Sequence, residues 1–193
     1  MNIGFDLDKV LIDYPPFVPP KLIDKLYKKK DNGVLIYRIP SLPEQLLRRA
    51  SHSPILRHAI KENLQFLKNI PKDNNKLYLV SSRFKFLEKR TEKLIKKLGL
   101  DKIFDGLFFN YENKQPHIFK NAVIKTLNLD IYIDDDLSLI KHVANENPKT
   151  IFYWLNQQGK NDQIFNNIFS ISKLDDIFKG KGLSVKGKEK YQQ

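Results

Sequence analysis

Cysteine is absent from this chain of 193 residues, and long apolar runs are absent as well. Without thiols the chain has no disulfide framework and no thiolate metal site. No apolar run approaches the roughly 20 residues that a membrane-spanning helix needs. An aspartate already stands at position 6, which is too early for a signal peptide. These absences predict a cytoplasmic protein that has no membrane partner.

Arginine is scarce, although the chain is strongly basic. Lysine and arginine together number 34 against 22 acidic residues, which gives a formal net charge of +12, but only six of the 34 are arginines. A sequence pI of about 9.6 is typical of nucleic-acid-binding proteins. Arginine, however, is the residue that makes forked contacts with phosphates and bases, so its scarcity disfavours a nucleic-acid partner.

Short apolar segments alternate with segments of helical periodicity along most of the chain. The predicted strands are 2–7, 77–80, 106–109, 131–133, 151–155 and 168–171. The helical patterns lie at 84–98, where Gly99 is placed to end the helix, at 118–127 and at 137–143. Strands without a polar face that alternate with helices predict an α/β fold, a Rossmann-like three-layer α/β/α arrangement with a mainly parallel sheet.

The interval between the first two strands is too long for a simple crossover. Residues 34–37 are a candidate strand, and Ser41 and Glu44 have the spacing of a capping box at the start of a helix. Pro54 marks the predicted start of another helix, which continues to about Ile70.

The chain is therefore predicted to divide into three parts. Residues 1–13 and 53–178 form the core domain, and residues 14–52 are a small helical cap inserted after the first strand. Residues 179–193, which carry part of the excess positive charge and little apolar material, form a disordered basic tail.

Acidic residues follow two of the predicted strands. Asp6 and Asp8 end the first strand, and Asp134, Asp135 and Asp136 directly follow the fourth. In a parallel sheet these two strands can be neighbours, and ligands bind at the carboxyl ends of the strands. Clustered carboxylates repel one another unless a cation lies between them, and a ligand set made only of oxygens is typical of Mg²⁺. The pattern predicts one magnesium site, with an acidic loop that binds no ion as the alternative.

Four motifs in this order resemble those of the haloacid dehalogenase-like (HAD) superfamily, in its phosphatase branch. They are an Asp-x-Asp segment after one strand, a serine that ends the next, a lysine that opens a helix, and an acidic pair after a later strand. The matching residues are Phe5-Asp6-Leu7-Asp8-Lys9-Val10, Leu79-Val80-Ser81, Lys120 and Ile133-Asp134-Asp135. The resemblance covers about residues 2–172, and Lys9 departs from it because the family often has glycine there.

The resemblance implies a role for each matched residue. Asp6 would attack phosphorus to form an aspartyl-phosphate, and Asp8 would protonate the leaving oxygen and then deprotonate the attacking water. Ser81 and Lys120 would bind the phosphoryl group. Mg²⁺ would be held by Asp6, the backbone carbonyl of Asp8 and Asp134, with Asp135 bound to it either directly or through water.

The expected substrate is a small phosphorylated metabolite. Arg83 follows Ser81 in a pattern similar to the Ser-x-Arg of nucleotidase-like members, so Arg83 and Lys9 are candidate substrate-binding residues. The cap region offers further groups for an anion, namely Arg38, Arg48, Arg49 and His52. The expected function is a Mg²⁺-dependent phosphatase that hydrolyses a nucleotide or sugar phosphate. The alternatives are a nucleic-acid end-processing phosphatase and a HAD-fold interaction protein without catalytic activity.

Overall fold

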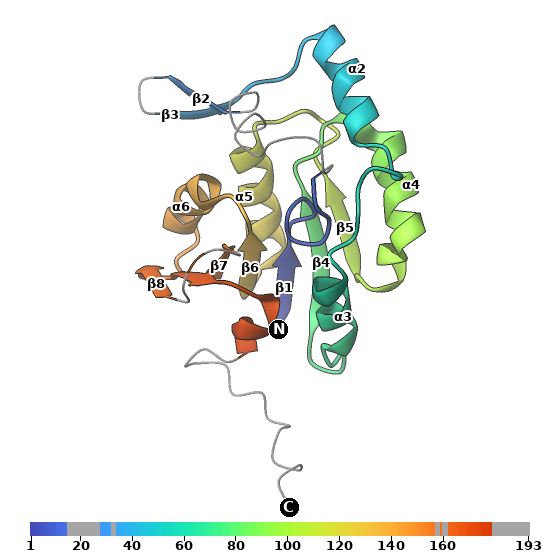
Figure 1. Ribbon diagram of the computed structural model, residues 1–193. Coiled ribbons are helices and arrows are strands. Elements are labelled where there is room, and N and C mark those ends of the chain that lie inside the picture. Colours follow the sequence, from blue (N-terminus) through green and yellow to red (C-terminus); the bar gives the residue numbers. More distant parts are fainter. Residues whose placement is uncertain (15–27, 32–33, 157–158, 160–161, 179–193) are drawn as a thin grey trace, which may run out of the picture.

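The structure, a computed structural model, describes residues 1–14, 28–31, 34–156, 159 and 162–178, and within these ranges its centre is a seven-stranded sheet (Figure 1). The strand order is β5-β4-β1-β6-β7-β9-β8, and all neighbours are parallel except β8 and β9. The strands are β1 (Asn2–Phe5), β4 (Lys76–Ser81), β5 (Gly106–Phe109), β6 (Ile131–Asp134), β7 (Ile151–Leu155), β8 (Asp162–Phe165) and β9 (Ile168–Ile171). The mainly parallel Rossmann-like sheet is thus confirmed, while β8 was not predicted.

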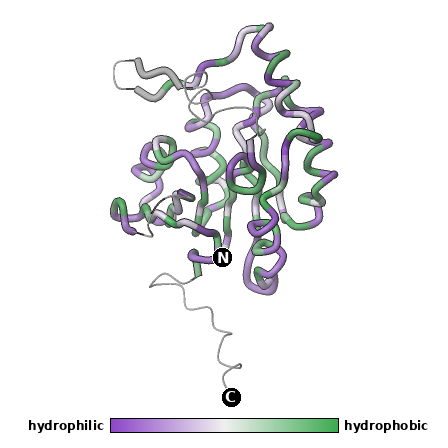
Figure 2. The backbone as a smooth tube through the Cα atoms, in the orientation of Figure 1, coloured by the Kyte–Doolittle hydropathy of each residue, from purple (hydrophilic) through white to green (hydrophobic). Residues whose placement is uncertain are grey.

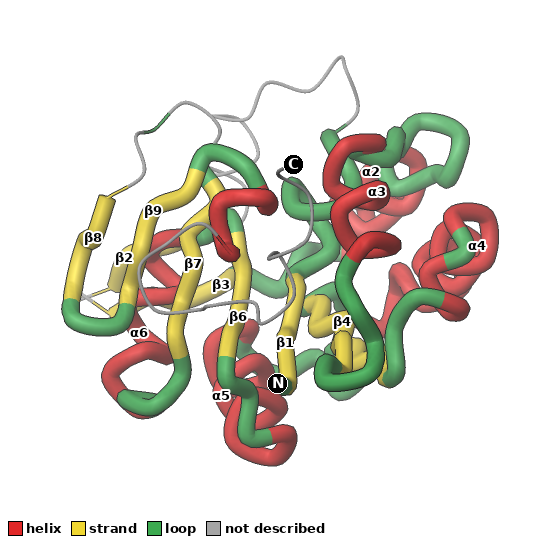
Figure 3. Tube along the Cα trace, turned by 90° about the horizontal axis from the view of Figure 1, so that it is seen from below, coloured by secondary structure: helices red, strands yellow, loops and turns green. Residues whose placement is uncertain are grey.

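Helices cover both faces of this sheet (Figure 3). On one face lie α5 (Pro116–Leu127) and α6 (Leu137–Glu146). On the other lie α3 (Lys61–Asn69), α4 (Glu88–Leu98) and the short 3₁₀ helix η3 (Leu174–Phe178). Two further 3₁₀ turns, η1 (Lys85–Leu87) and η2 (Leu100–Lys102), flank α4, in which hydrophobic and hydrophilic residues alternate around the helix (Figure 2).

Alternation along β1 decides where the residue that follows it points. Ile3 and Phe5 belong to the core cluster on the α3 and α4 side, whereas Gly4 faces Leu129 and Tyr132 on the α5 side. The backbone N–H of Asp6 donates to the carbonyl of Ile133 at 2.9 Å, so the ladder between β1 and β6 continues one residue further. Because side chains alternate, Asp6 is directed to the same side as Gly4, toward α5.

Two predicted helix boundaries, one end and one start, are confirmed, and another predicted start is wrong. Gly99 ends α4 with φ at 64°, and the capping box at Ser41 opens α2 (Leu42–Ser51), with Glu44 accepting from the Ser41 N–H at 2.7 Å. The helix predicted to begin at Pro54 begins instead at Lys61. Ala59 forms an antiparallel bridge with Ile12, and this extended pairing keeps the preceding residues out of the helix.

The elements between β1 and α3 lie at the carboxyl ends of the strands (Figure 1). Among the residues that the structure describes, they are α2 and a two-stranded antiparallel sheet of β2 (Lys28–Asp31) and β3 (Val34–Tyr37), so the described part of this region is helical only in part. The cap boundaries at 14–52 remain a prediction, and the predicted basic tail at 179–193 lies outside the described residues. No helix in the described part of the chain is long and apolar enough to cross a membrane.

We expect Gly4→Ala to lower the free energy of unfolding by about 1–3 kcal/mol, the usual range for overpacking a filled core. A Cβ atom there would lie 2.5 Å from Leu129 Cδ1 and 2.9 Å from Tyr132 Cδ2, and both residues are buried. Urea unfolding checks this. Gly99→Asn is the control, because nothing lies within 4 Å of a Cβ there and Asn tolerates a left-handed φ, so its change should stay within about 0.5 kcal/mol. Equal stability of Gly4→Ala and the wild type would contradict the packing described.

Candidate active site

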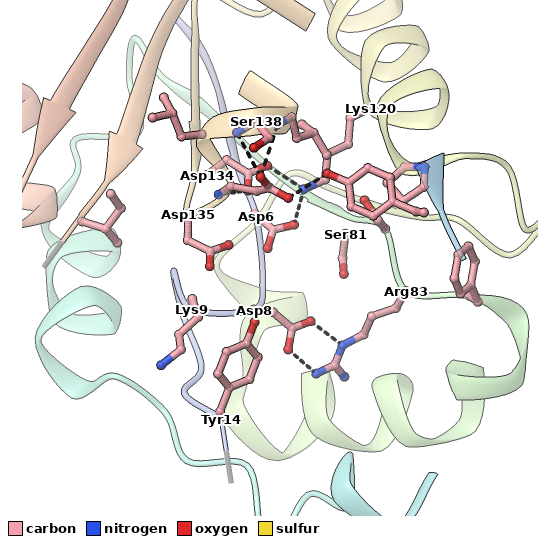
Figure 4. A pocket seen from close by; sticks show the side chains of 18 of the residues that line it. Asp6, Asp8, Lys9, Tyr14, Ser81, Arg83, Lys120, Asp134, Asp135 and Ser138 are labelled. Carbon is pink, nitrogen blue, oxygen red and sulfur yellow. Dashed lines mark hydrogen bonds and ion pairs between the residues drawn. The ribbon is translucent and has the colours of Figure 1, made fainter. Parts of the chain in front are cut away.

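One buried lysine joins the acidic residues at the ends of β1 and β6. The Nζ of Lys120 donates to Asp6 Oδ1 at 2.7 Å and to Asp134 Oδ2 at 2.6 Å (Figure 4). Lys120 is 3% exposed, Asp6 5% and Asp134 1%. Lys120 lies one turn into α5. Side chains alternate between the two faces along β1 and β6, and this alternation directs both carboxylates toward α5. The two predicted acid groups are therefore brought together, as adjacent parallel strands require.

Backbone and side-chain hydrogen bonds fix the loop after β6. The phenol of Tyr132 donates to Asp134 Oδ2 at 3.0 Å, and the N–H of Asp136 donates to Asp134 Oδ1 at 3.0 Å. Asp136 is the N-cap of α6, since its Oδ1 accepts from the Ser138 N–H at 3.0 Å. The indole of Trp154 donates to the carbonyl of Asp135 at 2.9 Å. Of the three consecutive acids, Asp136 thus has a structural task, and the other two carboxylates remain near Asp6.

The carboxylates of Asp6, Asp134 and Asp135 fit a divalent cation. Each offers an oxygen, and these oxygens lie within 4.8 Å of one another. Burial raises the pKa of Asp6 to about 6, with Asp134 adding to the rise and Lys120 opposing it. Burial, together with the charges of Asp134 and Asp6, raises the pKa of Asp135 well above its ordinary value. Three carboxylates with one ammonium leave negative charge that a hard cation with oxygen ligands would offset.

Asp8 lies apart from this group and contacts arginines instead. Arg83 donates to it through two atoms, with Nε 2.8 Å from Oδ2 and Nη2 2.9 Å from Oδ1 (Figure 4). Arg57 also forms an ion pair with Asp8. Arg57 was missed in the sequence, because nothing in its neighbourhood marks it. The predicted substrate-binding role of Arg83 stays a prediction, but two of its donor atoms are used by Asp8.

Ser81 and Lys9 complete the set of predicted site residues. Ser81 ends β4, is buried, and has its side chain directed into the same cavity as Asp6 and Asp8 (Figure 4). Lys9 has a φ of 63°, which is in the left-handed region that favours glycine, the residue often found at this position in the family. The Nζ of Lys9 donates to Asp13 Oδ1 at 2.6 Å. Lys9 therefore adopts the turn conformation at this position and also lines the cavity with a cation.

A cavity of about 520 Å³ opens over these residues. Its floor is formed by the strand ends, and its opposite wall by residues of β3 and α2 and the residues that directly follow these elements, namely Tyr37, Arg38, Arg48 and His52. Tyr37 connects this wall to the floor side of the cavity, because its phenol donates to Asp136 Oδ2 at 2.7 Å and its N–H donates to Gln115 Oε1 at 2.9 Å. Of the four cap residues predicted to meet an anion, Arg49 is the exception, since its Nε donates to the Phe86 carbonyl at 3.1 Å and it does not line the cavity.

His52 is a neutral group in this wall. Burial and the charges of Arg83 and Arg48 lower its pKa to about 3. Its Nδ1 lies 2.8 Å from the carbonyl of Arg48, so this nitrogen carries the proton in the neutral ring. The positive charge on this side of the cavity therefore comes from arginines and lysine rather than from histidine.

Comparison with known proteins shows which solved structures have a similar fold. No protein-family model matches the sequence, and no curated protein matches it either. A HAD-superfamily hydrolase of Ehrlichia chaffeensis is 17% identical with a TM-score of 0.52, and the match covers 91% of this chain and 93% of that one. The archaeal β-phosphoglucomutase of Pyrococcus sp. strain ST 04 is 14% identical with a TM-score of 0.55, covering 92% and 96%.

A third solved structure has ligands. It is an aspartate-to-alanine variant of a HAD family enzyme from Bacteroides thetaiotaomicron, in complex with magnesium and inorganic phosphate, 16% identical with a TM-score of 0.52. The match covers 82% of this chain and 95% of that one. At these identities the likeness concerns the fold. The chain therefore has the fold of the HAD-superfamily hydrolases, as the order of its motifs predicted.

We expect Mg²⁺ to raise the melting temperature more at pH 7.5 than at pH 5. The pKa of Asp6 is raised from 3.8 to about 6, so without metal the stability from this group is full below about pH 4 and is lost as the pH rises through 6. A cation binds the ionised carboxylates and restores that loss, and at about 100 times its Kd it adds about 2.7 kcal/mol.

Thermal unfolding with Mg²⁺ and with a chelator at both pH values checks this expectation. Asp135→Asn should reduce the shift, and Asp175→Asn, which changes an exposed acid on η3, should retain it. Equal shifts at the two pH values, or a shift unaffected by Asp135→Asn, would contradict a cation site at these carboxylates.

Proposed function

We propose that the protein is a Mg²⁺-dependent phosphatase that hydrolyses a small phosphomonoester through an aspartyl-phosphate at Asp6. One observation carries the proposal: buried Lys120 binds both Asp6 and Asp134, beside Asp135, on the floor of a cavity at the carboxyl ends of the strands. A nucleophile, a charge-balancing cation and a metal-ligand set are thereby assembled at the edge where parallel sheets bind ligands.

Asp6 supplies the nucleophile in this proposal. Its carboxylate, oriented by Lys120, forms a bond to phosphorus while the bond to the ester oxygen breaks. The leaving oxygen takes a proton from Asp8, whose side chain is 23% exposed and lines the cavity. Water then attacks the phosphorus of the aspartyl-phosphate and gives its proton to Asp8. The second step releases inorganic phosphate and returns Asp6 to its carboxylate form.

Charge on the transferring group is balanced by residues around it. Lys120 faces the carboxylate that attacks, and Ser81 offers a hydroxyl from the end of β4. Asp6, Asp134 and Asp135, with the backbone carbonyl of Asp8, would hold the magnesium ion. When bound, magnesium reduces the repulsion between the anionic phosphoryl group and the attacking carboxylate.

The cavity supports a small substrate. A volume of about 520 Å³ falls within the usual range for small-molecule sites. Its wall of β3 and α2 residues covers the acids, and its cationic groups suit a phosphorylated metabolite such as a nucleotide or sugar phosphate. The similar solved structures include a β-phosphoglucomutase and an enzyme in complex with magnesium and inorganic phosphate, which agrees with this class of substrate.

We expect Asp6→Asn to lower the turnover of p-nitrophenyl phosphate with Mg²⁺ by roughly 10³-fold or more, because the amide cannot form the covalent intermediate. Release of inorganic phosphate by the wild type and the variant is the measurement, extended to a panel of nucleotide and sugar phosphates to identify the substrate. Asp175→Asn is the matched control and should keep wild-type turnover. Unchanged turnover in Asp6→Asn, with the melting temperature retained, would exclude the proposed mechanism.

A further inference from the structure

Asp8 is the site residue with the most unusual surroundings. Its side chain is 23% exposed, while the side chains of the two arginines that bind it are 1% exposed for Arg57 and 3% for Arg83. Arg57 does not line the cavity, whereas Arg83 lines it beside Asp8. A carboxylate at a cavity can be solvated by water, so its own burial does not require two arginines.

Arg83 fixes the plane of the Asp8 carboxylate. Two parallel N–H···O bonds from one guanidinium, at 2.8 and 2.9 Å, allow a single relative orientation of the two planar groups. Arg83 is itself held, because its Nη1 donates to the hydroxyl of Thr91 at 3.3 Å, and Thr91 is fully buried on α4. The position of Asp8 is thereby tied to the helix that follows β4.

Arg57 approaches Asp8 from the segment between α2 and α3. This segment pairs with the turn that carries Asp8, since the Asp13 N–H donates to the His58 carbonyl at 2.8 Å and the Ile60 N–H donates to the Leu11 carbonyl at 2.9 Å. The guanidinium of Arg57 also lies over the ring of Tyr14, with its central carbon 5.2 Å from the ring centre. Asp8 and Arg57 are therefore anchored to one pair of backbone segments.

Placing two arginines here is costly. Burial and the charge of Arg83 lower the pKa of Arg57 to about 9. Among the residues that the structure describes, neither Nε nor Nη2 of Arg57 has a hydrogen-bond partner, although Nη2 forms the ion pair with Asp8. Burial of paired charges often adds nothing to stability compared with apolar packing. The arrangement is better explained by a need to hold Asp8 in one place than by a need for stability.

We propose that Arg57 and Arg83 are positioning residues that clamp the Asp8 carboxylate in the orientation required for its proton transfers at Asp6. The inference rests on the proposed function and adds to it two residues that act through Asp8 rather than on the substrate. Proton transfer requires the donor and acceptor within hydrogen-bond distance, and a misplacement of about 1 Å can cost 100-fold in rate. Loss of the clamp should therefore act on the chemical steps and not on substrate binding.

A double-mutant cycle on turnover of p-nitrophenyl phosphate tests the clamp. We expect Arg83→Gln to lower kcat by about 10- to 100-fold, with KM changed by less than about 3-fold. In the Asp8→Asn background the same substitution should change kcat by less than about 2-fold, because the group that it positions is already lost. Arg90→Gln, which changes an exposed arginine of α4 outside the cavity, is the control and should match the wild type.

Lysine variants distinguish the effect of the planar two-point contact with Asp8 from the effect of a positive charge alone. Arg83→Lys keeps the positive charge but lacks the planar fork, so we expect it to show the same loss in kcat as Arg83→Gln, whereas Arg57→Lys keeps the single ion pair and should lose less. They also serve if Arg57→Gln or Arg83→Gln fails to fold, which the melting temperature reports. Full activity in Arg83→Lys would overturn the clamp in favour of a simple charge effect.

The remaining outcomes also decide the matter. Independent losses that multiply in the double variant would overturn the clamp while leaving the proposed phosphatase intact. A rise in KM at constant kcat would assign the arginines to substrate binding and likewise overturn it. Absence of turnover by the wild type on every phosphate ester tested would overturn the proposed function, and the clamp with it, which is a different result from an additive cycle.

Discussion

The contact of Lys120 with Asp6 and Asp134 is the interaction on which the candidate site depends. Two carboxylates at the ends of adjacent parallel strands face the same helix, and without a cation their repulsion and burial would be strongly unfavourable. Lys120 balances part of that charge, and a metal at Asp135 would balance more. Strand order, the direction of α5 and the chemistry of the cavity are therefore parts of one electrostatic arrangement.

The second acid of the first motif belongs to a different environment. Asp6 is held by the lysine of α5, whereas Asp8 is held by Arg83 from the segment after β4 and by Arg57 from the segment before α3. Two carboxylates that are two residues apart thus have separate partners on separate elements. This separation suits two separate tasks, attack on phosphorus and transfer of protons, because each group is oriented independently of the other.

The sequence predicted the sheet, its helices and the acids at its strand ends, because these depend on local periodicity and on the rule that ligands bind at the carboxyl ends of parallel strands. It did not predict Arg57, or the bond from Tyr37 to Asp136, because both are long-range contacts between segments with no local signal. The prediction of a helix start at Pro54 was wrong, because the β-bridge between Ala59 and Ile12 overrides the local helix-start signal of the proline. Tertiary contacts of this kind cannot be read from periodicity.

The most direct test of the account is detection of the covalent intermediate. The protein is mixed with Mg²⁺ and p-nitrophenyl phosphate, quenched in acid and digested, and the peptides are examined by mass spectrometry. The proposed mechanism predicts a phosphoryl group on the peptide that contains Asp6, at a higher level in Asp8→Asn because water is no longer deprotonated efficiently in the second step. Turnover that proceeds with no phosphoryl group on Asp6, or with one on another residue, would contradict it.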